Sequence, residues 1–270
     1  CGGGAAPLPM GVYDIIVFNR SFNDFSNIAF RGNSYETLEA YARKVETRVD
    51  KKTRVETRTI ISSPDEWAAA TLEGFTVTED MLGNYSQTTY GRTAPSRSSE
   101  ETPDGLYHLH FVPKKLTREV SAVLHIEGLN NIRSATCRLG GVAESIFLAT
   151  GKTSANTVTQ EFTPSNPEFS PGSPFNGTLS CEFEIFGLNV IDNNNLHLDA
   201  LLVDGKTEFE GDCTNVKITE NDDGTGSVTL ILEASTEKVP DVKPEGGAGS
   251  GFDVDVDGWG NEINTDIPIN

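Results

Sequence analysis

The sequence predicts an all-β protein composed of two β-sandwich domains. Apolar and polar residues alternate with a period of two in many short segments, which is the pattern of strands with one buried face. Turn-forming stretches such as residues 221–224 (Asn-Asp-Asp-Gly) separate these segments, and short strands joined by such turns are typical of sandwiches. The 270 residues fit two domains of roughly 100–150 residues each.

The first half of the chain is expected to begin with a strand and to contain one short helix. Residues 13–18 form a nearly continuous apolar run, as expected of a strand covered on both faces. The helix is predicted because apolar residues recur at the spacing i, i+3, i+4, i+7 after Asn33 and Glu36, a pair that resembles a capping box. These apolar residues are Leu38, Tyr41, Ala42 and Val45. A second helical turn is expected at residues 63–66, where Pro64 suits the first helical position.

Period-two alternation predicts five further strands. They are expected at residues 107–111, 120–126, 179–185, 196–202 and 228–232. The polar stretch at 84–105 is interpreted as a long exposed loop, and a second polar stretch at 163–177 interrupts the second domain.

The domain organisation follows from these breaks in the pattern. We expect a tether at residues 1–10, an N-terminal sandwich at 11–114 and a C-terminal sandwich at 115–270. The last of these includes a Gly-rich linker at 239–251 and a terminal strand.

Composition limits the classes of partner. The net charge is −19, from 40 acidic and 21 basic residues. Nucleic acid is therefore not an expected partner, because phosphate neutralisation supplies most of the affinity of such binding. No apolar run approaches the roughly 20 residues that a spanning helix needs, so we expect the protein to lie on a membrane and not within it.

The cysteines suggest an anchor at one position only. Cys1 is followed by Gly-Gly-Gly-Ala-Ala, which resembles a processed bacterial lipoprotein whose N-terminal cysteine carries lipid and whose flexible stretch spaces the body from the membrane. The resemblance predicts Cys1 as a lipid anchor. Cys137, Cys181 and Cys213 fit no zinc spacing, and either one disulfide with a leftover thiol or three buried thiols are expected.

No motif predicts catalysis or a cofactor, so the chain is not expected to be an enzyme. Asp253, Asp255 and Asp257, followed by Gly258, look like the start of a calcium loop, although position twelve is Asn264 in place of a carboxylate. The same aspartates alternate with apolar residues, as in a strand with one wet acidic face. The strand is the favoured interpretation, and the aspartates are only a weak metal candidate.

The four histidines give no stronger metal signal. His108 and His110 share one face of a predicted strand, but no third ligand is placed near them by the sequence. A solvated face is the favoured interpretation. His125 and His197 are expected to stand alone, each opposite an apolar face.

Several segments in order resemble the two-domain fimbrial lipoproteins of Bacteroidales, the transthyretin-like minor or anchor subunits of type V pili. They are Cys1, the early strand at 13–19, the helix start at 34–41, the segments 63–67 and 140–151, and the tail 251–260 followed by Ile267-Pro-Ile269. The resemblance implies two transthyretin-like, Greek-key sandwiches and a cell-envelope lipoprotein that acts as a fimbrial subunit or anchor in cell adhesion. It implies other fimbrial subunits as partners. It also implies an outer-membrane location, at the cell surface or on the periplasmic face.

The resemblance also implies assembly by donation or acceptance of a β-strand, and the C-terminal tail is the segment suited to this. An extended tail on a Gly-rich linker could complete an exposed sheet edge of a neighbouring subunit, or it could be the last strand of its own domain. The candidate residues are Phe252, Val254, Val256, Trp259, Ile263, Ile267 and Ile269. The alternative function is a glycan-binding surface lipoprotein of a polysaccharide-uptake system. Only Trp67 and Trp259 are available as tryptophans for an aromatic platform, which disfavours it.

Overall fold

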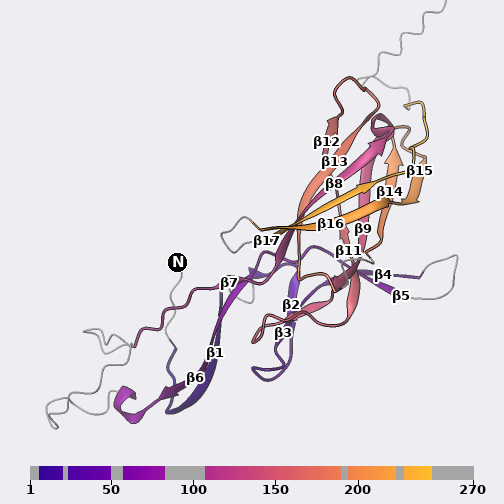
Figure 1. Ribbon diagram of the computed structural model, residues 1–270. Helices are drawn as coiled ribbons and strands as arrows, with labels where there is room; N and C mark the ends of the chain where they lie inside the picture. Colours follow the sequence, from indigo (N-terminus) through magenta and orange to yellow (C-terminus); the bar gives the residue numbers. More distant parts are fainter. Residues whose placement is uncertain are drawn as a thin grey trace, which may run out of the picture.

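The protein is built almost entirely from strands (Figure 1). The computed structural model describes residues 6–20, 24–49, 57–82, 107–189, 194–222 and 228–244. Within these ranges there is no helix of seven residues or more, and no helix is long and apolar enough to cross a membrane. The predicted all-β sandwich is therefore confirmed.

Two large sheets form the body of the molecule. The six-stranded sheet has the order β15-β14-β9-β11-β5-β4 and the five-stranded sheet has the order β12-β13-β8-β17-β16. The strands of the first are β4 (Lys44–Val49), β5 (Thr57–Ile61), β9 (Ile132–Ala143), β11 (Thr157–Phe162), β14 (Leu196–Leu202) and β15 (Glu208–Asp212). Those of the second are β8 (Arg118–Glu127), β12 (Asn166–Phe169), β13 (Asn176–Ile185), β16 (Thr214–Asp222) and β17 (Val228–Ser235).

The core lies between these two sheets. On β14 buried and half-buried residues alternate strictly, because successive side chains of a strand point to opposite faces. Phe162 of β11 stacks on Phe183 of β13 across the core, with ring centroids 4.3 Å apart. The strands predicted at 120–126, 179–185, 196–202 and 228–232 are thus confirmed as parts of β8, β13, β14 and β17.

Two smaller sheets complete the fold. One has the order β10-β3-β2 and the other the order β1-β6-β7. Their strands are β1 (Gly11–Phe18), β2 (Ile28–Arg31), β3 (Glu39–Ala42), β6 (Ala68–Val77), β7 (Lys114–Lys115) and β10 (Ser145–Phe147). Figure 1 shows β1 and β6 as a two-stranded arm that extends away from the body. The strand predicted at 13–18 is present as part of β1. None of its residues is fully buried, however, so it is not covered on both faces as expected.

The predicted helix in the first half is wrong. Residues 39–42 form β3, which pairs with both β2 and β10. Ala40 and Ala42 point into the core, whereas Val45 is 57% exposed on the next strand. The two alanines are buried with a period of two, and their strand is paired on both sides. These contacts stabilise the strand more than the helix, because an isolated helix of about two turns is only marginally stable. Only one turn survives, closed by the hydrogen bond from Leu38 N–H to the Ser34 carbonyl at 2.9 Å.

The helical turn predicted at 63–66 is also absent. The Asp65 carboxylate, which could have capped such a turn, instead accepts hydrogen bonds from the backbone N–H groups of Ser26 and Asn27, both at 2.9 Å. The polar stretch 163–177 contains the exposed strand β12.

Strand pairing crosses the predicted domain boundary. Residues 114 and 115 themselves form β7, which pairs with β6. In addition β10 pairs with β3, and β11 pairs in parallel with β5. Whether the two halves fold as separate domains stays a prediction.

Candidate functional site

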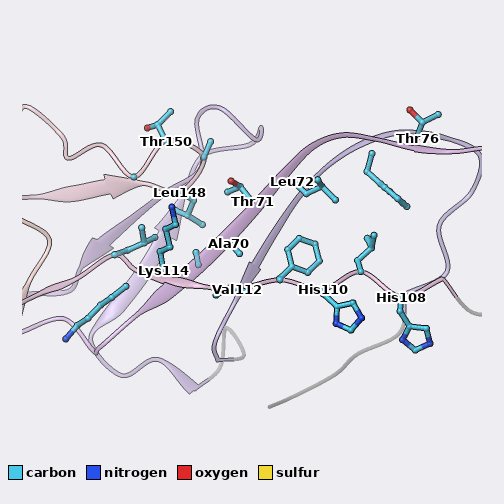
Figure 2. Close-up of a pocket in the computed structure, with 18 of the residues that line it drawn as sticks. Ala70, Thr71, Leu72, Thr76, His108, His110, Val112, Lys114, Leu148 and Thr150 are labelled. Carbon is cyan, nitrogen blue, oxygen red and sulfur yellow. The ribbon is translucent and has the colours of Figure 1, made fainter. Parts of the chain in front are cut away.

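An open groove of about 960 Å³ lies along one side of the arm (Figure 2). Its lining comes from β6, the segment 108–112, β7 and the turn after β10. These residues are Ala69, Ala70, Thr71, Leu72, Phe75, Thr76, Met81, His108, Leu109, His110, Phe111, Val112, Lys114, Lys115, Leu116, Leu148, Ala149, Thr150 and Gly151. Apolar side chains predominate, which is typical of a surface that binds another chain or a ligand.

The groove follows an unpaired strand edge. On one side β6 pairs with β1 along its length, from Ala69 opposite Phe18 to Val77 opposite Gly11. On the other side β7 pairs with Ala68 and Ala69 only. Among the described residues, β7 is the one named strand that pairs with this side of β6, and Tyr107, at the start of the segment that runs beside β6, is in an isolated bridge. The backbone N–H and C=O groups of β6 beyond Ala69 are a template for a further strand.

The segment beside this edge runs along β6 without joining its sheet. The sequence predicts a strand at 107–111, but residues 108–113 form none. Pro113 lacks the N–H that would continue the β7 ladder. The expected alternation nevertheless persists, because Leu109 and Phe111 are half-buried while His108 and His110 are exposed.

The two exposed histidines fit the solvated interpretation. In Figure 2 their rings lie on the side of the segment away from β6. Both histidines still border the groove, together with the half-buried Leu109 and Phe111.

A bulge shapes the arm. The β1–β6 register shifts between Tyr13 and Ile15, and opposite this point Gly74 has φ +66°, a left-handed conformation that glycine adopts most readily. The Asp14 carboxylate accepts the Gly74 N–H at 2.9 Å, so the backbone donor at the bulge is satisfied. Bulges of this kind bend and twist a strand pair, and here the bulge lies midway along the groove.

Four aromatic rings fix the arm to the body. Trp67, immediately before β6, is fully buried. Its ring lies 5.6 Å from Phe30, 6.1 Å from Phe25 and 6.2 Å from Phe18, each in an edge-to-face arrangement. The Trp67 carbonyl also accepts a hydrogen bond from Leu116 N–H at 2.8 Å, at the end of the groove. The base of β6 is thus held rigidly while its outer part stays open.

Lys115 closes the body end of the groove with an ion-pair cluster. Its ammonium lies 2.7 Å from a Glu184 oxygen, 3.6 Å from Glu66 and 3.9 Å from Glu119. Partial burial alone would lower the pKa of Lys115, but the hydrogen bond to Glu184 and the charges of the three carboxylates outweigh it and raise the pKa. The lysine therefore stays charged and ties β7 to β13.

Most residues that the sequence singled out do not fall within the described part of the chain. Cys1 lies outside the described residues, and its lipid attachment stays a prediction. The strand-complementation candidates and the three aspartates of the weak metal candidate also lie outside them. The residues concerned are Phe252, Asp253, Val254, Asp255, Val256, Asp257, Trp259, Ile263, Ile267 and Ile269.

The three described cysteines are free thiols. Burial raises the pKa of Cys181 and of Cys213 to about 11 and the pKa of Cys137 still further. Since the thiolate is the reactive form, these cysteines are poor nucleophiles. The alternative of three buried thiols describes them better than a disulfide, although Cys181 and Cys213 are only partly buried.

Comparison with curated proteins gives no match. Two solved structures share features of the fold. One is a candidate adhesin from Bacteroides ovatus, 15% identical, with a TM-score of 0.48, covering 76% of this chain and 65% of its own. The other is a candidate adhesin from Bacteroides thetaiotaomicron, 14% identical, with a TM-score of 0.34, covering 74% of this chain and 59% of its own. The chain thus spans less than two thirds of the length of either protein, and at these scores neither similarity bears on function.

A family model gives a more definite result. The model described as a domain of unknown function, DUF5119, matches residues 1–163. This match includes the whole arm, the groove and the first strands of the body. Since it covers more than half of the sequence, the chain belongs to the DUF5119 family.

Proposed function

We propose that the chain is a cell-envelope lipoprotein that acts as a fimbrial subunit or anchor and joins its neighbours by β-strand complementation. The observation that carries this proposal is the groove along the unpaired edge of β6. The occupant we propose is an extended strand of an adjacent subunit.

The dimensions of the edge suit a strand. The unpaired part of β6, residues 70–77, is about 26 Å long at about 3.3 Å per residue. Its half-buried side chains include Ala70, Leu72 and Phe75. An incoming strand with apolar residues at every second position would cover them, and each apolar side chain that it buries contributes about 1.5–3 kcal/mol. Main-chain hydrogen bonds to β6 would add affinity, as in other strand-addition complexes.

The C-terminal tail has the pattern that such a groove requires. Phe252, Val254 and Val256 alternate with aspartates, so a docked strand would place apolar side chains inward and carboxylates outward. Lys114, which is exposed and lines the groove, supplies a positive charge close to such carboxylates.

The tail leaves the body at the end opposite to the groove. Val239, close to the last described residue, donates its N–H to the Glu127 carbonyl at 2.9 Å, which is the carboxyl end of β8. The groove adjoins Lys115 and Leu116, just before the amino end of the same strand. Ten residues of β8 separate the two ends, about 30 Å of extended chain. A donor at one end and an acceptor at the other make a head-to-tail contact, which generates open filaments where the rotation between subunits does not close into a ring.

The test measures capture of the tail. A labelled peptide of residues 251–270 is titrated into the chain truncated after residue 250, with binding followed by fluorescence anisotropy. We expect saturable binding that Leu72→Glu abolishes, because a carboxylate would then face the apolar occupant. Val12→Glu is the matched control, since Val12 lies on the same arm, is 70% exposed and does not line the groove. The proposal would be refuted if the truncated parent chain does not bind the peptide. It would also be refuted if Leu72→Glu binds the peptide as well as Val12→Glu does.

Truncation also separates a neighbour's strand from a self-strand. If the tail serves a neighbouring subunit, removing residues 251–270 leaves the melting temperature of the monomer unchanged and prevents copurification with other subunits. A clear drop in melting temperature would instead assign the tail to its own domain. Lipid attachment is tested separately by detergent partitioning. The parent chain is expected in the detergent phase, and the Cys1→Ala variant in the aqueous phase.

A further inference from the structure

Four titratable side chains meet on the solvent-facing side of β14 and β15. His197 and Asp199 alternate with the buried Leu196 and Leu198 along β14, so they point away from the core. On β15, Glu210 and Asp212 likewise point outward. The antiparallel register places His197 opposite Asp212 and Asp199 opposite Glu210. The sequence predicts that His197 stands alone, and this is wrong because the register brings three carboxylates beside it.

The contacts of the imidazole identify what the group can hold. Its Nδ1 lies 2.8 Å from an Asp212 carboxylate oxygen, and its Nε2 lies 3.2 Å from Asp199 Oδ1. A neutral imidazole has one N–H and one nitrogen lone pair. With Nδ1–H donated to Asp212, Nε2 is the nitrogen that can coordinate a cation, and Asp199 Oδ1 lies beside it.

We propose that His197, Asp199 and Glu210 bind one divalent transition-metal ion, and that zinc is the ion whose preferences fit best. One ligand atom from each of the three residues lies within 4.8 Å of the others. Zinc binds histidine nitrogen and carboxylate oxygen at about 2.0–2.2 Å, so two ligands at a tetrahedral angle lie roughly 3.4 Å apart. The 3.2 Å between His197 Nε2 and Asp199 Oδ1 is close to this separation. Water would occupy the fourth position.

The residues around the group orient these ligands. Asp212 Oδ1 lies 2.8 Å from His197 Nδ1 and would accept its N–H with a metal on Nε2, and such an outer carboxylate fixes the ring and strengthens its basicity toward a metal. Arg138 of β9 is paired with Asp199 through the other carboxylate oxygen, Oδ2, and with Glu161 at 3.1 Å. The guanidinium leaves Oδ1 of Asp199 directed toward His197. The local carboxylates outnumber this one positive charge, so the site attracts a cation.

The choice of zinc over calcium follows from the ligand set. Calcium takes six to eight oxygen ligands, whereas this group offers a nitrogen and a few oxygens on two rigid neighbouring strands. Because protons compete with metal for imidazole and carboxylates, affinity is expected to fall as the pH is lowered.

The test uses the full-length chain, stripped of metal with EDTA and titrated with zinc chloride by calorimetry. We expect one zinc ion per chain at this site. Asp212→Asn is expected to weaken binding by about 10–100-fold, the usual effect of losing an outer-shell partner, and His197→Ala and Glu210→Gln by more than that. Glu210 is exposed, so its variant keeps the test valid even if the His197 variant fails to fold.

Matched controls exclude other binding groups. His125→Ala removes an exposed histidine of β8, and Glu208→Gln removes the next outward carboxylate of β15. Both are expected to bind zinc as the parent chain does. Substitution with cobalt(II) should give the visible absorption of a tetrahedral complex, and His197→Ala should abolish it.

Two outcomes would overturn the proposal. One is zinc binding that survives Glu210→Gln and His197→Ala but is lost when Asp253, Asp255 and Asp257 are all changed to Asn. The other is binding of calcium without binding of zinc. Neither outcome affects strand capture by β6, which lies in a different sheet.

Discussion

Replacing Trp67 by Ala is expected to be among the most destabilising single changes in the first half of the chain. The side chain is fully buried and contacts three phenylalanines with centroid separations of 5.6–6.2 Å. Truncating a buried aromatic residue to Ala destabilises a protein by about 3–5 kcal/mol. Three edge-to-face ring contacts, each adding about 0.5–1.5 kcal/mol beyond area burial, place the expected loss at the upper end of that range.

The expected loss can be converted into a melting temperature. For 270 residues that unfold together, an unfolding entropy of about 2.1 cal/mol/K per residue converts 3–5 kcal/mol into a drop of about 5–9 °C. Differential scanning calorimetry measures this drop. Urea denaturation followed by far-ultraviolet circular dichroism gives an independent free energy for this variant and for the control below.

Trp67→Phe is the matched control. Among the described residues no acceptor lies within hydrogen-bond distance of the Trp67 ring N–H. Phenylalanine removes this buried donor, which is favourable by about 1–3 kcal/mol, and leaves a cavity that is unfavourable by a similar amount. The control should therefore melt close to the parent chain. Equal melting of Trp67→Ala and the parent, or a larger drop for Trp67→Phe than for Trp67→Ala, would refute the assignment of Trp67 as the base of the arm.

Two further predictions concern backbone conformation and pH. Gly32→Ala should lower the melting temperature much more than Gly74→Ala. Both glycines have positive φ, but an added Cβ at Gly32 would lie 2.2 Å from the Thr37 carbonyl oxygen, whereas at Gly74 it would meet nothing within 4 Å. The Gly74 variant therefore bears only the backbone penalty of about 1–2 kcal/mol. Similar drops for the two variants would contradict this. Burial alone would raise the pKa of Asp65, but hydrogen bonds from Asn27 and Ser26 outweigh it and lower the pKa. The stability contributed by Asp65 is thus present above the pKa of its unfolded form and is lost as the pH falls through its lower folded pKa. In acid titrations followed by circular dichroism, Asp65→Asn should be less stable than the parent at neutral pH, and the difference should shrink as the pH falls. A constant difference would contradict the hydrogen-bonding role.

The sequence was sufficient to predict four strands of the body, β8, β13, β14 and β17, because apolar and polar residues alternate along them as in β14. It was insufficient where the decisive contacts are distant in the chain. Ala40 and Ala42 are strand residues because β2 and β10 flank them, and β10 lies about a hundred residues further along. The same limit hid both candidate sites.

For the groove, the stretch Ala-Ala-Ala-Thr-Leu-Glu-Gly-Phe-Thr-Val of β6 shows partial alternation, and its glycine signals a bulge. Nothing local reveals that one edge lacks a partner. For the metal site, His197 and Asp199 are spaced two residues apart, as are Glu210 and Asp212. Each spacing predicts a shared strand face. Only the register between β14 and β15 brings the two pairs together.

The edges of the four sheets differ in a way that bears on assembly. Proteins protect exposed edge strands from unwanted pairing with charged residues, proline or short length. The edge strand β15 carries Glu208, Glu210 and Asp212 within five residues, β16 carries three charges in nine, and β12 has only four residues, one of them a proline. By contrast, β6 has ten residues and a single charge, Glu73, and its second side is paired by β7 at Ala68 and Ala69 only. A long, weakly charged strand with such a side can accept a further strand. Its persistence beside an apolar groove, in a chain with a net charge of −19, is the physical reason for expecting that β6 is where a neighbouring subunit adds its strand.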